Sequence, residues 1–216
     1  MAINHSHYLE IKQNIPLNVS LCIVTKHHSK EDILSYYDLG ERIFAENRAQ
    51  EFLKKKDLPN DIEWHFIGHL QKNKVRQIIP YVSCIQSLDS FVLAQLIDKE
   101  CKRIHKILPV YAQFHLATED TNKYGLSKEE AFSFFSNCEK LTNIEVCGMM
   151  VMGPHTANTK RIEEVFQEAN TLFHSLRKDF PKLKVLSMGM SDDYKIAIQC
   201  GSTMIRIGSY LFEGDE

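Results

Sequence analysis

The sequence has no excess of charge of either sign and no long hydrophobic run. Its 216 residues include 26 basic and 28 acidic ones, for a formal net charge of −2, so no general attraction to nucleic acid or to a membrane surface is expected. The longest apolar run, VCGMMVM at 146–152, is far shorter than the roughly 20 residues that span a bilayer. Residues 1–17 have neither the basic nor the apolar region of a secretory signal, so we expect a cytoplasmic protein.

Paired cysteines, flexible linkers and the dinucleotide-binding fingerprint are also missing. The six cysteines stand singly with no C-x-x-C pair, and we expect buried, free thiols rather than a disulfide framework. Without a Pro- or Gly-rich linker or a strict repeat, residues 1–216 are predicted to form a single domain. No G-x-G-x-x-G follows an early strand, so a dinucleotide-binding fold has no support.

Short apolar runs alternate with longer amphipathic segments along the whole chain. Helix-start signals stand at Ser29, Asp89, Ser127 and Ser191. Strands are expected at 19–25, 42–46, 63–68, 82–87, 109–116, 144–152, 184–189 and 203–208. Strands that alternate with helices are typical of parallel βαβ units, and eight of them predict a closed α/β fold, the (β/α)8 TIM barrel. A doubly wound open sheet is the alternative.

Lys26 ends the first predicted strand. The alternation of a strand places Cys22, Val24 and Lys26 on one face. Functional groups gather at the carboxyl ends of the strands in either architecture, so Lys26 is expected at the mouth of the barrel. A lysine held there is partly desolvated, which favours the neutral amine that Schiff-base chemistry requires. A lysine that simply extends into water is the alternative.

Two turns near the end of the chain have the composition of an anion site. One precedes a helix expected to open at Ser191, and the other, Gly208–Ser209, follows the eighth predicted strand. Barrels commonly bind phosphate at the loops after strands seven and eight. The alternative is that Ser191 is just a helix cap, with Asp192 and Asp193 complementing the helix dipole. The two aspartates argue against an anion unless their side chains face away.

Arg206 lies on the eighth predicted strand and is expected to point into the barrel, because its neighbours Ile205 and Ile207 suit the face beneath the helices. A buried guanidinium requires an acceptor. That acceptor is either an inward carboxylate such as Glu46 or a ring nitrogen of a bound heterocycle. A lysine, an anion site and an inward arginine together describe a site for pyridoxal 5′-phosphate.

Several long segments match one known family. They are IVTK (23–26), FAENRAQE (44–51), WHFIGHLQKNK (64–74), IQSLDS (85–90), NKYG (122–125), SMGMSDD (187–193) and GSTMIRIGSYLFEG (201–214). In these segments the chain resembles the pyridoxal phosphate homeostasis proteins, also called proline synthase co-transcribed homologues. The resemblance implies a single barrel of the alanine racemase N-terminal type that binds pyridoxal phosphate.

The resemblance also implies a role for each site residue. Lys26 would form the internal aldimine, and Arg206 would face the pyridine nitrogen. Ser191 and the backbone amides of Gly208 and Ser209 would hold the phosphate. The family asparagine close to the cofactor corresponds to Asn47.

The chain departs from the family pattern in two places. A threonine is usual where Ser209 stands, and the serine keeps the hydroxyl. The family often has a threonine and later a proline after the lysine, where this chain has His27 and His28, which gives the rim of the site an unusual composition.

An arginine opposite the pyridine nitrogen keeps that nitrogen unprotonated, so the ring is a weaker electron sink. Racemases built on this barrel take a second acid or base from an additional C-terminal domain, whereas this sequence ends at Glu216, soon after the last predicted strand. We therefore expect a non-catalytic binder that takes part in intracellular vitamin B6 homeostasis. A weak amino-acid racemase and a scaffold that senses cofactor level are the alternatives. Client pyridoxal phosphate enzymes are the expected partners, and the protein is expected to be a monomer or weak dimer.

Two histidines and a basic run are interpreted structurally. His65 and His69 are four residues apart, but WHFIGH is typical of a strand that runs into a turn, so no metal site is predicted. The KKKD run at 54–57 is expected to be a solvated helix end.

Met149, Met150 and Met152 are expected to fill the core, with contact between the end of their strand and the cofactor as an alternative. Whether Lys123 offers a second attachment point for the cofactor is left open.

Overall fold

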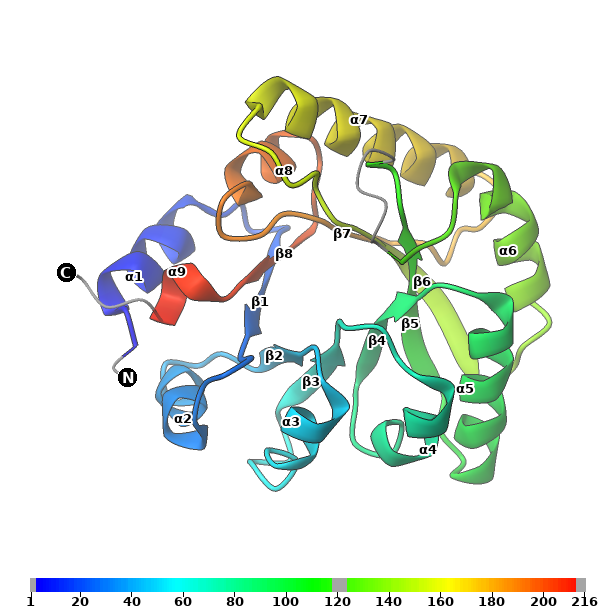
Figure 1. Cartoon of the computed structure of the whole chain (residues 1–216), viewed down its shortest axis with the longest axis horizontal. Helices are drawn as coiled ribbons and strands as arrows, with labels where there is room; N and C mark the ends of the chain where they lie inside the picture. Colours follow the sequence, from blue (N-terminus) through cyan, green and yellow to red (C-terminus); the bar gives the residue numbers. More distant parts are fainter. Residues whose placement is uncertain (1–2, 118–123, 213–216) are drawn as a thin grey trace.

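The computed structural model describes residues 3–117 and 124–212, and its eight parallel strands close into a barrel (Figure 1). The strands pair in chain order, and β8 pairs with β1, with Leu21 opposite Ile205. They are β1 (Ser20–Val24), β2 (Ile43–Glu46), β3 (Glu63–Phe66), β4 (Cys84–Leu88), β5 (Leu108–Phe114), β6 (Ile144–Val151), β7 (Val185–Ser187) and β8 (Met204–Ile207). Each corresponds to a predicted strand, so the predicted TIM barrel is confirmed and the open sheet is wrong.

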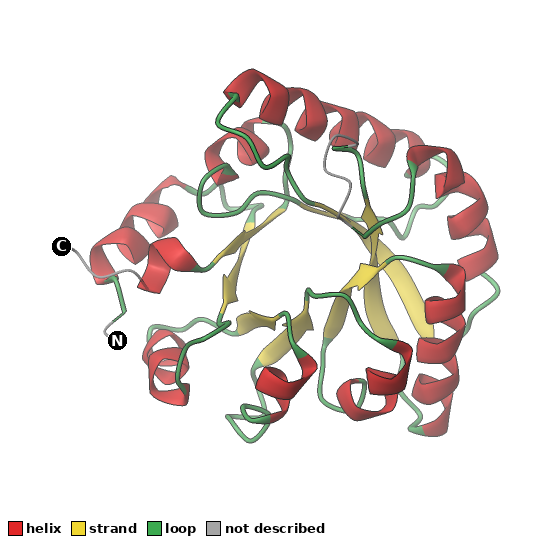
Figure 2. Cartoon of the chain, in the orientation of Figure 1, coloured by secondary structure: helices red, strands yellow, loops and turns green. Residues whose placement is uncertain are grey.

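Helices surround the strands on the outside (Figure 2). They are α1 (His5–Asn14), α2 (Lys30–Asp38), α3 (Ala49–Leu53), α4 (Val75–Ile78), α5 (Phe91–Arg103), α6 (Ala131–Cys138), α7 (Thr159–Leu176), α8 (Tyr194–Gln199) and α9 (Ser209–Phe212), with short 3₁₀ turns η1 (Lys72–Lys74) and η2 (Lys128–Glu130). The first and last helices lie side by side, and the Asn4 N–H donates to the Leu211 carbonyl at 2.8 Å. Within residues 3–117 and 124–212, no helix is both long and apolar enough to cross a membrane.

Capping side chains begin two of the helical segments where the sequence predicts them. The Ser29 hydroxyl accepts from the Asp32 N–H at 3.1 Å, and the Asp32 carboxylate accepts from the Ser29 N–H at 3.0 Å. Such a reciprocal pair satisfies two otherwise unpaired donors of the first turn. Ser127 and Glu130 form the same box ahead of η2 and α6.

Two predicted helix starts are wrong because the side chains are used elsewhere. Ser90, not Asp89, caps α5, since the Asp89 carboxylate is bound by His69 at 2.9 Å. Helix α8 begins at Tyr194 rather than Ser191, whose hydroxyl accepts from that of Ser209 at 3.1 Å.

The alternation along the strands divides the apolar residues into two layers. The larger layer, between strands and helices, includes Leu21, Ile23 and Phe44. The smaller one fills the barrel interior and consists of Cys22, Val24, Ala45, Cys84, Tyr111, Met150 and Met204. Burial of each large apolar side chain contributes about 1.5–3 kcal/mol. The predicted faces of β1 are therefore confirmed, and the chain emerges from β1 directed toward the mouth.

Candidate functional site

A cavity of about 480 Å³ opens at the carboxyl ends of the strands, a volume suited to a small molecule. All six predicted site residues line it: Lys26, Asn47, Ser191, Arg206, Gly208 and Ser209. Closure of the barrel through the pairing of β8 with β1 brings the two ends of the chain to the same cavity. Their roles toward a ligand stay predictions.

Lys26 follows β1 at the cavity wall, and its side chain is exposed, so the predicted desolvation of this lysine is wrong. The next residue, His27, has a φ of 69°, which turns the chain sharply after the lysine. His28 stacks on Phe212 with ring centroids 3.6 Å apart, and burial lowers its pKa. One of the two rim histidines therefore packs against the C-terminal helix.

A buried ion pair lies directly behind Lys26 and Asn47. The Lys55 Nζ donates to Glu46 Oε1 at 2.6 Å and to the Thr25 carbonyl at 2.7 Å. Thr25 also donates its hydroxyl to the same carboxylate oxygen at 2.6 Å. The cluster therefore ties together the residues that immediately precede Lys26 and Asn47.

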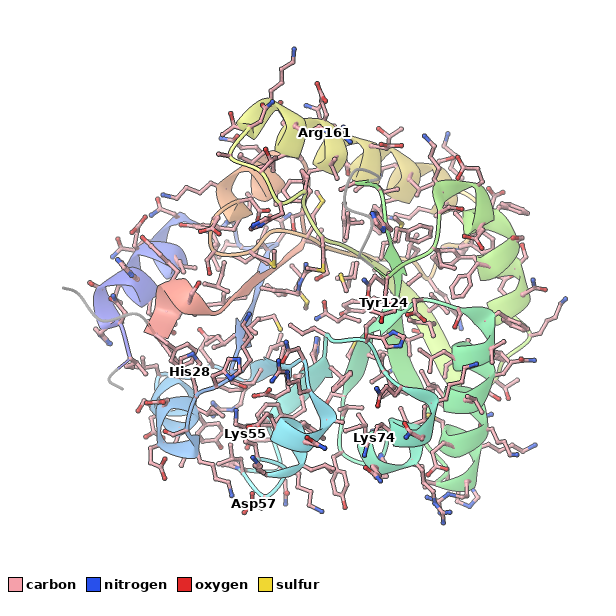
Figure 3. All side chains as sticks on the ribbon, viewed as in Figure 1. His28, Lys55, Asp57, Lys74, Tyr124 and Arg161 are labelled. Atoms are coloured by element: carbon pink, nitrogen blue, oxygen red, sulfur yellow. The ribbon has the colours of Figure 1, made fainter. Side chains whose placement is uncertain are left out.

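The prediction of a solvated basic run at 54–57 is wrong for Lys55, which is 4% exposed, although its neighbours on both sides are exposed. Lys55 is on the side of the barrel that α2 and α3 cover (Figure 3). Because Glu46 is engaged by Lys55 on the outer side of β2, the alternative of an Arg206–Glu46 ion pair is also wrong.

Arg206 points into the barrel, as predicted, and is 3% exposed. Its Nη1 donates to Ser187 Oγ at 2.7 Å and its Nη2 to the Val151 carbonyl at 3.1 Å. Burial lowers the pKa of Arg206 to about 10, so the guanidinium stays charged at neutral pH. Arg206 also lines the cavity.

The two predicted anion turns meet at one side of the cavity. The Ser209 hydroxyl lies 3.1 Å from that of Ser191. Asp193 is buried and accepts from the Met190 N–H at 2.6 Å, and burial raises the pKa of its carboxyl group. Asp192 is exposed and lines the cavity. An anion site here was predicted to require that both aspartate side chains face away from it. Asp193 meets this requirement and Asp192 does not.

Asn47 brings an unsatisfied acceptor to the cavity. Its Oδ1 is buried and has no hydrogen-bond partner in the described part of the chain. A buried polar atom of this kind is uncommon in proteins, so Asn47 Oδ1 is a candidate acceptor for a ligand. The backbone of Asn47 packs so closely on Gly68 that a Cβ at position 68 would lie 1.9 Å from the Asn47 carbonyl oxygen.

Gly68→Ala is expected to lower the free energy of unfolding by about 3 kcal/mol, because the backbone of Asn47 must move to admit a methyl group. Urea denaturation measures this change. The matched variant is Gly208→Ala, whose Cβ would lie 3.2 Å from the Val24 carbonyl oxygen and should cost far less. Equal losses in the two variants would contradict the close approach at Gly68.

Sequence reasoning missed part of the cavity wall. His69 and Tyr124 line it and stack on each other with centroids 3.9 Å apart, and Tyr124 lies over the barrel end near β5 (Figure 3). The Nδ1 of His69 is 2.9 Å from Asp89 Oδ2. Their positions in the sequence could have predicted this, because His69 and Asp89 closely follow the carboxyl ends of β3 and β4.

The remaining predictions for this region have different outcomes. His65 lies on β3 and His69 in the following turn, as predicted. Met150 and Met152 line the cavity, whereas Met149 packs in the outer layer. Lys123 lies outside the described residues.

The fold and the site define a class, the barrel of the alanine racemase N-terminal type. The family model described as "Alanine racemase, N-terminal domain" matches residues 4–215. The solved alanine racemase of Clostridium difficile superimposes with a TM-score of 0.82 over 97% of this chain and 57% of that chain. At 15% identity this likeness shows the fold alone.

Curated relatives identify one family within this class. Proteins named pyridoxal phosphate homeostasis protein are 37% identical in Helicobacter pylori, over 90% of this chain and 87% of that protein, and 38% identical in Synechocystis, over 96% of each. The solved structure of PipY from Synechococcus elongatus with PLP bound is 30% identical, with a TM-score of 0.89 over 96% of this chain and 98% of that chain. The chain belongs to the pyridoxal phosphate homeostasis protein family, as the sequence predicts.

Proposed function

We propose that this chain binds pyridoxal 5′-phosphate in the 480 Å³ cavity and takes part in the homeostasis of that cofactor. One observation carries the proposal: a single cavity joins an exposed lysine amine, two serine hydroxyls 3.1 Å apart and a buried, charged guanidinium. These groups complement an aldehyde, a phosphate and a pyridine nitrogen. The names of the curated relatives and the PLP in PipY support the same ligand.

The residues present fit this cofactor. Lys26 would hold its aldehyde carbon, and Arg206 would donate to its ring nitrogen. The hydroxyls of Ser191 and Ser209, with the backbone amides of Gly208 and Ser209, would hold the phosphate. The unpaired Oδ1 of Asn47 would accept from a ligand hydroxyl. When bound, the cofactor supplies an aldehyde that condenses with a primary amine with loss of water.

The arrangement suits storage and transfer more than turnover. A guanidinium that donates to the ring nitrogen leaves that nitrogen unprotonated, which weakens the ring as an electron sink. We therefore propose a carrier without robust catalysis. A weak amino-acid racemase is the second candidate, and the His69–Asp89 pair on the cavity wall favours it because an imidazole held by a carboxylate is a competent acid–base group.

Proton exchange in deuterated buffer separates the two functions. Protein that retains pyridoxal phosphate after desalting is incubated with L-alanine, and NMR follows loss of the α-proton. The carrier is expected to exchange the proton no faster than free cofactor at the same concentration. Sustained exchange that disappears in His69→Ala would instead establish the racemase, and failure to retain cofactor would refute both.

A further inference from the structure

A chain of polar groups runs through the barrel interior behind Arg206. Its Nη1 donates to Ser187 Oγ at 2.7 Å, and that hydroxyl donates to Gln86 Oε1 at 2.7 Å. On the other side of the amide, Gln86 Nε2 lies 2.7 Å from His65 Nδ1. The four residues come from β8, β7, β4 and β3, and each is at most 4% exposed. Only Arg206 lines the cavity, so the other three act through it.

Donors and acceptors along these hydrogen bonds are assigned from the guanidinium at one end and the thioether of Met204 near the other. A guanidinium has only donors, so Ser187 Oγ accepts from Arg206, and the Ser187 hydroxyl donates its own hydrogen to Gln86 Oε1. The Gln86 amide then presents one N–H to His65 Nδ1 and the other to Met204 Sδ, 3.3 Å away. The opposite orientation of the amide would set its carbonyl oxygen against the thioether sulfur, two acceptors facing each other.

With the amide in this orientation, His65 accepts at Nδ1 and carries its proton on Nε2. Burial lowers the pKa of His65 to about 4, so the ring is neutral at physiological pH and can take this part. A protonated ring would oppose an N–H to the N–H of Gln86. The chain thus ends at a neutral acceptor whose tautomer is determined by its partner.

Among the described residues, no carboxylate is hydrogen-bonded to Arg206. Its two bonded acceptors are a serine hydroxyl and a backbone carbonyl, both neutral. Asp193 raises the pKa of Arg206 electrostatically, but its carboxylate accepts from the Met190 N–H. A cation held by neutral groups keeps its attraction for an acceptor in the cavity.

We propose that Ser187, Gln86 and His65 are positioning residues, whose one-way chain of hydrogen bonds orients the Arg206 guanidinium toward a heterocyclic nitrogen of the ligand. This inference rests on the proposed function. It assigns a role to three interior residues that touch no ligand. Substitution of these residues is expected to increase the mobility of the Arg206 guanidinium more than it weakens the attachment of the ligand at Lys26.

The first test uses the cofactor-free protein. Long-range ¹H–¹⁵N NMR at pH 7 is expected to show His65 with its proton on Nε2, and the Nη resonances of Arg206 as separate, slowly exchanging signals. In Ser187→Ala the Arg206 signals should average. A His65 protonated on Nδ1, or Arg206 signals unchanged in Ser187→Ala, would overturn the proposal.

The second test measures retention of pyridoxal phosphate. In Ser187→Ala the cofactor should be released about tenfold faster, the effect of losing one charge-assisted hydrogen bond that aligns a donor, and its absorbance maximum should shift. Gln86→Met has a similar shape but removes both the acceptor behind Ser187 and the donor to His65. It should change the release rate and the absorbance maximum in the same direction as Ser187→Ala, by a smaller amount. If Ser187→Ala does not fold, the release rate and absorbance maximum of Gln86→Met test the positioning role instead.

Ser202→Ala is the matched control. Ser202 is also buried, at 2% exposure, and its hydroxyl donates to the Met188 carbonyl at 2.7 Å, away from Arg206. Both serine variants should lose thermal stability, but only Ser187→Ala should alter release and absorbance. Identical release from the two variants would overturn this inference alone. A wild-type protein that retains no cofactor would overturn the proposed function and this inference with it.

Discussion

Lys26→Ala is expected to reduce the pyridoxal phosphate retained after desalting to the level of a protein-free control. The change removes the amine that we propose holds the aldehyde, and the other cavity groups bind only by hydrogen bonds and charge. Because Lys26 is exposed, the free energy of unfolding should change by no more than about 0.5 kcal/mol. Absorbance after gel filtration measures retention, and thermal denaturation measures stability.

Lys30→Ala is the matched control for this prediction. Lys30 lies four residues further on, pairs with the exposed Asp57 at 2.6 Å and is absent from the cavity wall. Its variant should retain cofactor as the wild type does. Unchanged retention in Lys26→Ala would contradict the role of Lys26, and an adduct found at Lys123 in that variant would identify a second attachment point.

Lys55→Met is expected to lower the free energy of unfolding by about 3–5 kcal/mol. The substitution leaves Glu46, which is fully buried, as an uncompensated charge. It also removes the donor to the Thr25 carbonyl, next to Lys26 in the chain. Urea denaturation measures the loss, and binding of pyridoxal phosphate to the folded fraction should weaken as well.

Two controls separate the buried pair from an ordinary loss of charge. Lys54→Ala removes the neighbouring exposed lysine, which pairs with Glu51 at 2.9 Å, and should cost at most about 1 kcal/mol. The double variant Lys55→Met/Glu46→Leu replaces both charges by apolar groups and should recover most of the stability. A single variant Lys55→Met as stable as Lys54→Ala would show that the pair does not organise this end of the barrel.

The fold was predictable because its signals are local and repeated. The two-residue alternation on β1, with Cys22 and Val24 on the inside and Leu21 and Ile23 on the outside, is present in the sequence itself. Two helix starts were predicted wrongly because serine and aspartate side chains can bind partners other than the first turn of a helix. Asp89 binds His69 instead of capping α5, and this choice depends on a contact between two different loops.

The wall of the site was predictable where a positional rule applies, namely that ligands bind at the carboxyl ends of barrel strands. The rule located Lys26 and Arg206 from opposite ends of the chain. The groups behind them escaped prediction. Lys55 lies in a run of lysines that is typical of solvated surface, and nothing local indicates that Glu46 is its partner. The pairing of Gln86 with Ser187 and His65 depends on registers across separate strands.

The most direct test of the central claim is borohydride reduction of the wild-type protein after incubation with pyridoxal phosphate, followed by peptide mapping by mass spectrometry. The account predicts one dominant phosphopyridoxyl adduct, on the Nζ of Lys26. An adduct distributed over surface lysines, or no adduct at all, would contradict the claim that Lys26, which follows β1 at the cavity wall, holds the cofactor.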